Sequence, residues 1–171
     1  MKLNKKHPLY QEDLQNILSL EGLKNIQGKT FLITGATGMV GVMLIDALMA
    51  LGNVKVIAVG RNREKAKNRL GEYFENDNFE FLVQDVCLPF PNNLDVDFII
   101  PAASNTHPLA YSKYPIETIL INVKGAENAL ELASKCNATV VYTSTNEIYG
   151  NAIANEVFTA RIAFSTSASL L

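Results

Sequence analysis

The chain has 171 residues, of which 48% are hydrophobic and 19% charged, and it carries a net charge of −2. This length and composition indicate one globular domain with a real core, and the scattered Lys and Arg residues argue against a nucleic-acid partner. No apolar run approaches the roughly 20 residues that a membrane-spanning helix needs, and the N-terminal stretch lacks the apolar core of a signal peptide, so we expect no membrane partner and a cytoplasmic location.

The chain opens with a polar lead-in, residues 1–27, in which Leu14, Ile17, Leu18 and Leu23 have nearly helical spacing. We expect a short helix there, packed on the edge of the domain. The domain itself is expected to span residues 28–150, and it contains neither internal repeats nor low-complexity stretches.

Short apolar runs that alternate with helical segments indicate an α/β domain. The runs that read as strands are residues 29–34, 54–59, 79–83, 96–100 and 138–142. The segments that read as helices are residues 38–51, 63–74 and 115–133. Because the strands are rich in Val, Ile and Phe, we expect a doubly wound, mostly parallel Rossmann-like sheet covered on both faces. Such a sheet usually has more strands than this, so we expect it to be incomplete at its C-terminal edge.

Single residues mark the ends of these helices. Gly52 stands where a C-terminal cap is expected, Asn62 can cap the second helix, and Pro115 suits the first position of the third. The third helix is also expected to carry an apolar face, made by Ile116, Ile119, Leu120 and Val123 and continued by Leu130 and Ala133.

The sequence shows no sign of a metal site. Its two cysteines, Cys87 and Cys136, and its two histidines have no metal-ligand spacing. Two cysteines are also too few for a disulfide framework. We therefore expect no metal, and we expect both cysteines to be small buried hydrophobes.

The sharpest pattern is a glycine-rich turn between the first strand and the first helix of the domain. Gly35, Gly38 and Gly41 let the backbone turn tightly, approach a pyrophosphate and pack the helix against the strand. The helix N-terminus then offers unpaired N–H groups and the positive end of its dipole to phosphates. The pattern therefore predicts dinucleotide binding, and the alternative is a turn whose glycines serve only close packing.

Five stretches, in order, resemble motifs of the extended short-chain dehydrogenase/reductases. They are "TGATGMVG", "QDV", "AAS", "INVKGAENALELA" and "TSTNEIYG", spread between about residues 29 and 150. Within that family they look like the nucleotide-sugar epimerases, dehydratases and decarboxylases, the NAD-dependent epimerase/dehydratase group. The resemblance implies an enzyme that uses NAD or NADP to oxidise a sugar hydroxyl transiently.

The resemblance also implies that the cofactor binds across the first three motifs. The first would hold the pyrophosphate, the second the adenine, and the third would lie beside the nicotinamide. In that order the corresponding residues are Gly35, Thr37, Gly38, Met39, Val40 and Gly41; Asp85 and Val86; and Ala102, Ala103 and Ser104. In the fourth motif, Asn122 would stabilise the loops on the cofactor side.

The last motif would carry the catalytic residues. Thr145 occupies the position whose hydroxyl, in this family, hydrogen-bonds the sugar oxygen that is oxidised. Asn146 and Glu147 stand where dehydratases carry a pair of acids, so the missing first acid favours an epimerase or a decarboxylase. The alternative is that the hydroxyls of residues 143–145 only satisfy local backbone groups at a strand end.

The residue after the second strand bears on which dinucleotide is bound. An acidic residue about 20 positions past the glycines usually holds the ribose 2′-hydroxyl of NAD, whereas an Arg accommodates the 2′-phosphate of NADP. This chain has Arg61 there, which favours NADP slightly. Arg61 could instead be only a solvated start to the next helix, and the redox-neutral epimerases that the chain resembles commonly keep NAD.

The acid and base that this family's chemistry needs are missing. The resemblance implies a Tyr as proton acceptor and a Lys four residues later, whose charge favours the tyrosinate. The residues four positions after the six tyrosines are Leu14, Asp77, Pro115, Thr118, Asn146 and Ile153. No Lys follows Lys135, and the atypical tail, residues 151–171, lacks the expected helix with its Tyr. We therefore expect a truncated or frame-shifted chain from which the substrate domain is absent.

Two hypotheses of different class follow. In the first, the chain is the dinucleotide-binding portion of a nucleotide-sugar enzyme, inactive alone, and meets a nucleotide-sugar substrate only in a full-length form. In the second, it is a non-catalytic dinucleotide-binding or sensing module that needs no Tyr and Lys pair. In either case the fifth strand is expected at an open sheet edge, which predicts self-association.

Overall fold

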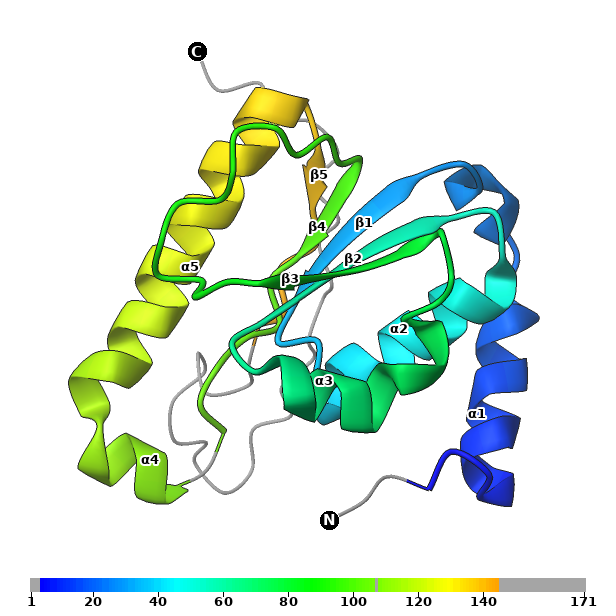
Figure 1. Ribbon diagram of the computed structural model, residues 1–171, viewed down its shortest axis with the longest axis horizontal. Helices are drawn as coiled ribbons and strands as arrows, with labels where there is room; N and C mark the ends of the chain where they lie inside the picture. The colour runs from blue at the N-terminus through cyan, green and yellow to red at the C-terminus, as the bar shows by residue number, and fades with distance from the viewer. Residues whose placement is uncertain (1–3, 107, 145–171) are drawn as a thin grey trace, which may run out of the picture.

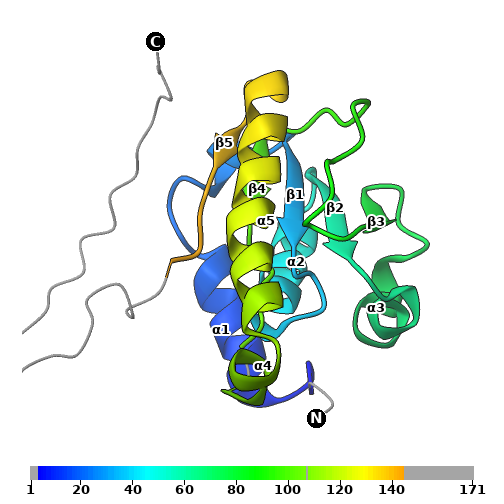
Figure 2. The same cartoon turned by 90° about the vertical axis from the view of Figure 1, so that its left-hand side faces the viewer.

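The computed structural model describes residues 4–106 and 108–144 and consists of a parallel sheet between layers of helices (Figure 1). In chain order the elements are α1 (Pro8–Leu18), η1 (Leu23–Ile26), β1 (Thr30–Thr34), α2 (Met39–Leu51), β2 (Lys55–Gly60), α3 (Arg63–Leu70), η2 (Gly71–Tyr73), β3 (Phe79–Val83), β4 (Phe98–Ile100), α4 (Pro108–Lys113), α5 (Pro115–Cys136) and β5 (Thr139–Val140). Figure 2 shows α5 across one face of the sheet, with α2 and α1 on the other side. Within the described residues, every helix falls short of the length or the apolar character that a bilayer-spanning segment requires.

Within this part of the chain, the sheet has five strands in the order β3-β2-β1-β4-β5, and all neighbours are parallel. β1 lies in the middle, where Leu32 pairs with Ile57 of β2 on one side and with Ile99 of β4 on the other. The chain thus builds the sheet from β1 outward to β3, and then in the opposite direction to β5. This confirms the predicted doubly wound, Rossmann-like sheet, although β5 has only two residues rather than the five expected at 138–142.

Alternate residues of the central strands point to opposite faces and form two separate cores. Phe31 and Ile33 of β1 belong to the core under α2 and α3, whereas Leu32 packs with Ala129 and Leu132 of α5. Because both faces are covered, these strands are almost continuously apolar, as buried parallel strands are. Leu32 and Ile33 are fully buried, and burial of each such side chain stabilises the fold by about 1.5–3 kcal/mol.

β4 begins at Phe98 rather than at residue 96, where the apolar run begins. Just before this strand, the side chain of Asp97 also contacts β1: its Oδ2 accepts the N–H of Thr30 at 2.9 Å. Lys29 Nζ donates to the other oxygen, Oδ1, at 2.8 Å. The hydrogen bond from Lys29, with that from the Thr30 backbone, holds the pKa of Asp97 below its ordinary value.

The predicted helix ends are confirmed, with one exception. Gly52 follows α2, the side chain of Asn62 caps α3, and Pro115 is the first residue of α5. The exception is the helix predicted over residues 63–74, which ends at Leu70 and continues as a 3₁₀ helix. The change falls at Gly71, a residue type with low helix propensity.

α5 has the predicted apolar face, but that face points away from the sheet. The residues on it are 44–72% exposed, and we call them the outer stripe: Ile116, Ile119, Leu120, Val123 and Leu130. The residues buried on the inner side of the helix are Ile121, Gly125, Asn128, Ala129, Leu132 and Ala133. Ala133 was expected to continue the outer face and belongs instead to the buried side. The helix therefore has two apolar sides, and the sheet covers only one of them.

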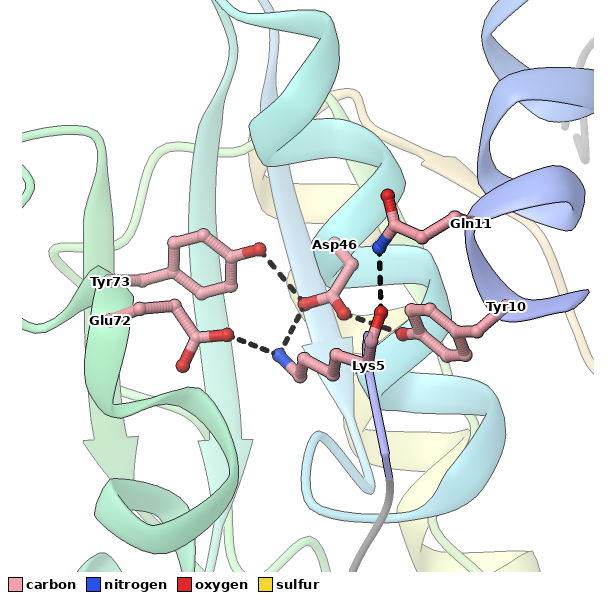
Figure 3. A network of polar contacts seen from close by, with 6 residues as sticks. All are labelled: Lys5, Tyr10, Gln11, Asp46, Glu72 and Tyr73. Atoms are coloured by element: carbon pink, nitrogen blue, oxygen red, sulfur yellow. Dashed lines mark hydrogen bonds and ion pairs between the residues drawn. The ribbon is translucent and has the colours of Figure 1, made fainter. Parts of the chain in front are cut away.

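A buried carboxylate fastens the N-terminal segment to the domain (Figure 3). Asp46 of α2 is 3% exposed and accepts hydrogen bonds from the hydroxyls of Tyr10 and Tyr73. Lys5 Nζ donates to Asp46 Oδ1 at 2.7 Å and also pairs with Glu72. Burial, together with the charge and hydrogen bonding of Asp46, raises the pKa of both tyrosines well above the ordinary value. Both hydroxyls therefore keep the protons that they donate, and the predicted N-terminal helix is held on the edge of the domain.

Removal of this carboxylate charge should destabilise the fold. In Asp46→Asn the ammonium group of Lys5 loses its buried partner, and we expect the free energy of unfolding to fall by about 2 to 4 kcal/mol. Denaturant unfolding followed by circular dichroism measures the change. Glu64→Gln is the control, because Glu64 is 80% exposed and pairs with Lys67 at 3.7 Å, where we expect less than about 0.5 kcal/mol. Equal effects of the two substitutions would contradict the role assigned to Asp46.

Candidate functional site

A cavity of about 790 Å³ lies at the carboxyl ends of the strands. Its lining comes from the segments that follow β1, β2, β3 and β4, and from α5. β1 and β4 are neighbours in the sheet although two other strands separate them along the chain, so the order of strands changes direction between them. Crevices of this kind are where open α/β sheets bind ligands.

The glycine-rich loop after β1 is packed too closely for a side chain at two positions. Gly35 has φ +64°, and a Cβ atom added there would lie 2.5 Å from the carbonyl oxygen of Ala102. A Cβ atom added to Gly41 would lie 2.5 Å from the carbonyl oxygen of Gly35. α2 begins at Met39, directly after Gly38, and both residues line the cavity. The unpaired N–H groups of its first turn are therefore available to a phosphate at this place.

A buried hydroxyl fixes the end of β1 to the loop after β4. Thr34 is 2% exposed, and its Oγ1 accepts the backbone N–H groups of Ala102 and Ala103, both at 3.1 Å. Two walls of the cavity are thus held together where the strand order changes direction. Sequence reasoning missed this residue, although a polar side chain at the end of an apolar strand was a usable signal.

Two further side chains, Asn128 and Arg69, hold other parts of the cavity wall. Asn128, buried on α5, donates to the carbonyl oxygen of Val86 at 2.7 Å. Arg69 of α3 donates to the carbonyl oxygen of Thr37, in the glycine-rich loop, at 2.7 Å. Sequence reasoning missed both residues. A lone amide on the small, apolar side of a helix was a signal for Asn128, whereas the role of Arg69 follows only from how α3 lies against the loop.

Every residue predicted to contact the cofactor, except Asn122, lines this cavity. These residues are Gly35, Thr37, Gly38, Met39, Val40, Gly41, Arg61, Asp85, Val86, Ala102, Ala103 and Ser104. Asn122 lies instead in a neighbouring hollow of about 40 Å³, where its amide donates to the carbonyl oxygen of Thr118 at 2.8 Å. Outside the described residues lie the predicted catalytic residues Thr145, Asn146 and Glu147.

The charged side chains of the cavity wall are Arg61, Lys65 and Asp85. Arg61 Nη1 lies 3.4 Å from Oε1 of Glu117, in the first turn of α5. Asp85 Oδ1 accepts the N–H of Cys87 at 2.9 Å, which fixes the turn after β3. Sequence reasoning missed Lys65. Its place four residues after Arg61, near the start of the next helix, was the available signal.

The Cys87 thiol is not a candidate nucleophile. Cys87 and Cys136 were expected to be buried, but both are only partly buried. For Cys87 the reason is its position in the turn after β3 rather than in a core. Burial, followed by the charge of Asp85, raises the pKa of the Cys87 thiol, so this thiol keeps its proton at neutral pH. Among the residues that the structure describes, no three His, Cys, Asp or Glu side chains gather as a metal site would require.

Residues 31–167 match the model of the NAD dependent epimerase/dehydratase family. The chain belongs to this family. It is 39% identical over 130 residues to UDP-glucuronic acid decarboxylase 2 of Arabidopsis thaliana, an alignment that covers 76% of this chain and 28% of that protein. It is 36% identical over 123 residues to UDP-glucuronic acid decarboxylase 1 of Danio rerio, with 72% of this chain and 29% of that protein covered. The chain thus spans 28–29% of the length of these two relatives.

Solved structures of two epimerases share the fold. UDP-glucuronic acid 4-epimerase of Bacillus cereus, in complex with NAD, aligns with a TM-score of 0.60 and 22% identity over 72% of this chain and 42% of that chain. UDP-N-acetylglucosamine 4-epimerase of Methanobrevibacter ruminantium aligns with a TM-score of 0.65 and 18% identity over 77% of this chain and 43% of that chain. With the family match, this likeness in fold confirms the resemblance to the extended short-chain dehydrogenase/reductases.

The packing of the loop predicts which glycine substitution is harmful. Gly35→Ala would place an alanine in the left-handed region and press its methyl group against the backbone of Ala102, so we expect the free energy of unfolding to fall by at least about 2 kcal/mol. Gly71→Ala is the matched control, because Gly71 has φ −56° and no atom within 4 Å of an added Cβ. There we expect no loss and a gain of up to about 1 kcal/mol. Denaturant unfolding compares the two, and a Gly35→Ala variant as stable as the parent would refute the packing described.

Proposed function

We propose that this chain is the dinucleotide-binding portion of a nucleotide-sugar enzyme that oxidises a sugar hydroxyl transiently. One observation carries the proposal: residues predicted to contact the cofactor, from segments after four different strands, line a single cavity. At two glycines of that lining, any side chain would collide with the backbone, so the tight turn that a pyrophosphate loop needs is possible there only with glycine. Membership of a family described as NAD dependent supports the same function.

The residues of the cavity fit a nicotinamide dinucleotide in three parts. The glycine-rich loop and the first turn of α2 would hold the pyrophosphate through backbone N–H groups. Asp85 and Val86, after β3, would contact the adenine, and residues 102–104, after β4, would lie beside the nicotinamide. When bound, the nicotinamide supplies the hydride acceptor that oxidation of a sugar hydroxyl requires. The expected role of Asn122 stays a prediction, because this residue lies beside the cavity rather than in it.

The proposed substrate is a nucleotide sugar, bound by a full-length form of the protein. The relatives that support it are UDP-glucuronic acid decarboxylases by name. Asn146, where dehydratases carry an acid, favours a decarboxylase or an epimerase over a dehydratase. Thr145 would hydrogen-bond the sugar oxygen that is oxidised, with Asn146 and Glu147 beside it.

The 171-residue chain is proposed to be inactive alone, because none of its tyrosines is followed four residues later by a Lys. Without that pair, no group takes the proton from the sugar hydroxyl. The alternative is a non-catalytic dinucleotide-binding or sensing module, for which the cavity alone would suffice. Turnover by a longer form of the protein would separate the two.

Titration with NAD and NADP tests the binding function. We expect weak binding of both, because the loop for the pyrophosphate is complete while the Lys that would hold the nicotinamide ribose is missing. Arg61→Asp should move the preference from NADP towards NAD by about tenfold, since it replaces a partner of the 2′-phosphate by a partner of the ribose hydroxyl. Calorimetry measures both affinities. The proposal would be contradicted if Arg61→Asp lowered the affinities for NAD and NADP equally, or if the parent chain bound neither.

A product assay with UDP-glucuronic acid tests the inactivity. We expect no turnover by the 171-residue chain, since general acid–base catalysis alone contributes about 10²–10⁴-fold. A form extended by the family's Tyr-x-x-x-Lys helix and substrate domain should be active, and Thr145→Ala in that form should remove most of the activity. Epimerised or decarboxylated product from the parent chain, above a Thr145→Ala control, would show that the chain is not inactive.

Self-association is proposed through the outer stripe of α5 and the edge of β5. The five side chains of the stripe are 44–72% exposed, and a contiguous apolar surface of this kind favours association. β5 pairs with β4, and no strand among the described residues covers its other side. An uncovered edge strand is a template for pairing with another chain.

Sedimentation velocity tests this association. The parent chain should contain species heavier than the monomer, and Ile119→Glu combined with Val123→Glu should reduce them. Leu88→Glu is the control, because Leu88 is also exposed, at 58%, but lies outside the stripe. A clean monomer for the parent chain would count against the proposal. The cytoplasmic location and the absence of a nucleic-acid partner stay predictions.

A further inference from the structure

One ion pair links two walls of the cavity. Arg61, directly after β2, lines the cavity, and its Nη1 lies 3.4 Å from Oε1 of Glu117 on α5. The same helix contributes Ile121, one turn further along, to the lining. The side chains of Arg61 and Glu117 are 60% and 48% exposed. Solvent therefore reaches the pair, and another anion in the cavity can compete for Arg61.

A second cation belongs to the wall of the same cavity. Lys65 lines the cavity, and its backbone N–H is held by the side chain of Asn62 at 2.8 Å. Within the described residues, its ammonium group forms no salt bridge. β2 ends at Gly60, so this strand end offers no carboxylate to a ribose hydroxyl. The cavity wall thus offers two cations to an anion, and Glu117 already contacts one of them, Arg61.

We propose that Glu117 sets the dinucleotide preference of this cavity by competing with the 2′-phosphate of NADP for Arg61. The inference rests on the proposed function, because it requires a dinucleotide in the cavity. A guanidinium binds carboxylates and phosphates through the same fork of N–H donors, so one anion displaces the other. The 2′-phosphate would also gain Lys65, whereas NAD, which lacks this phosphate, leaves Arg61 with Glu117. Glu117 therefore lowers the affinity for NADP and leaves that for NAD unchanged.

Two small ligands isolate the 2′-phosphate. Adenosine 2′,5′-bisphosphate carries this phosphate and AMP does not, so the ratio of their affinities reports only on the contacts of the 2′-phosphate. Glu117→Gln removes the competing charge and keeps the size of the side chain. Since an exposed ion pair contributes little, we expect the affinity for the bisphosphate to rise about two- to fivefold, with no change for AMP. Lys65→Gln should lower the affinity for the bisphosphate about five- to tenfold, again with no change for AMP.

The experiment is calorimetric titration of the 171-residue chain with these two ligands and with NADP and NAD, which should follow the same pattern. Glu127→Gln is the matched control. Glu127 lies on the same helix, is 48% exposed like Glu117, and pairs with Lys124 at 2.6 Å. The control changes the net charge equally, so it corrects for long-range electrostatics, and we expect no change in the affinity ratio.

A higher ratio of bisphosphate to AMP affinity in Glu117→Gln, absent from Glu127→Gln, supports the inference. The inference is overturned if the ratio of bisphosphate to AMP affinity is unchanged in Glu117→Gln, or if it rises equally in Glu117→Gln and Glu127→Gln. Neither outcome affects dinucleotide binding itself. Failure of the proposed function has a different signature: the parent chain would bind none of the four ligands, and the inference would fall with it.

Discussion

The close approach of the backbone after β1 to the backbone after β4 is the constraint on which the rest of the structure depends. The two strands are neighbours in the middle of the sheet, and the hydroxyl of Thr34 holds their ends together. Gly35 lets the two loops touch, because a single added methyl group would strike the carbonyl of Ala102. The shape of the cavity at this crevice therefore follows from backbone packing more than from the positions of long side chains.

Charge is distributed unevenly around this cavity. The chain as a whole carries a net charge of −2, yet two of the three charged side chains in the cavity wall are cations, Arg61 and Lys65. The first turn of α2 adds the positive end of a helix dipole. An anionic ligand would thus meet two cations and a helix N-terminus in a molecule whose net charge is negative.

The sheet could be predicted from the sequence because its signals are local. Strands buried on both faces are continuously apolar, and the cap at Asn62 is formed within one turn. The orientation of α5 could not be predicted in this way, since both of its sides are apolar. Small residues, Gly125 and Ala129, lie on the buried side of the helix. They let the helix approach the sheet closely, and this close approach determined its orientation, although Ile119 and Val123 on the outer side are larger.

The features of the cavity, too, could be predicted from the sequence only where they depend on neighbouring residues. The glycine spacing marks the pyrophosphate loop because it acts through the residues that carry it. The contact from Arg61 to Glu117 joins positions 56 residues apart, and the contact from Arg69 to Thr37 joins positions 32 residues apart. Neither leaves a pattern in the sequence, because each depends on how helices lie against the sheet once it has formed.

The Asp46 network is confined to the early part of the chain. Its side chains lie between Lys5 and Tyr73, before β3 begins. It joins α1, α2 and η2, and it includes no residue of β4, α5 or β5. Interactions at separate sites that share no partners contribute almost additively. The anchorage of α1 therefore shares no hydrogen-bond partner with the elements at the β5 edge of the sheet, and substitutions at that edge should leave it unchanged.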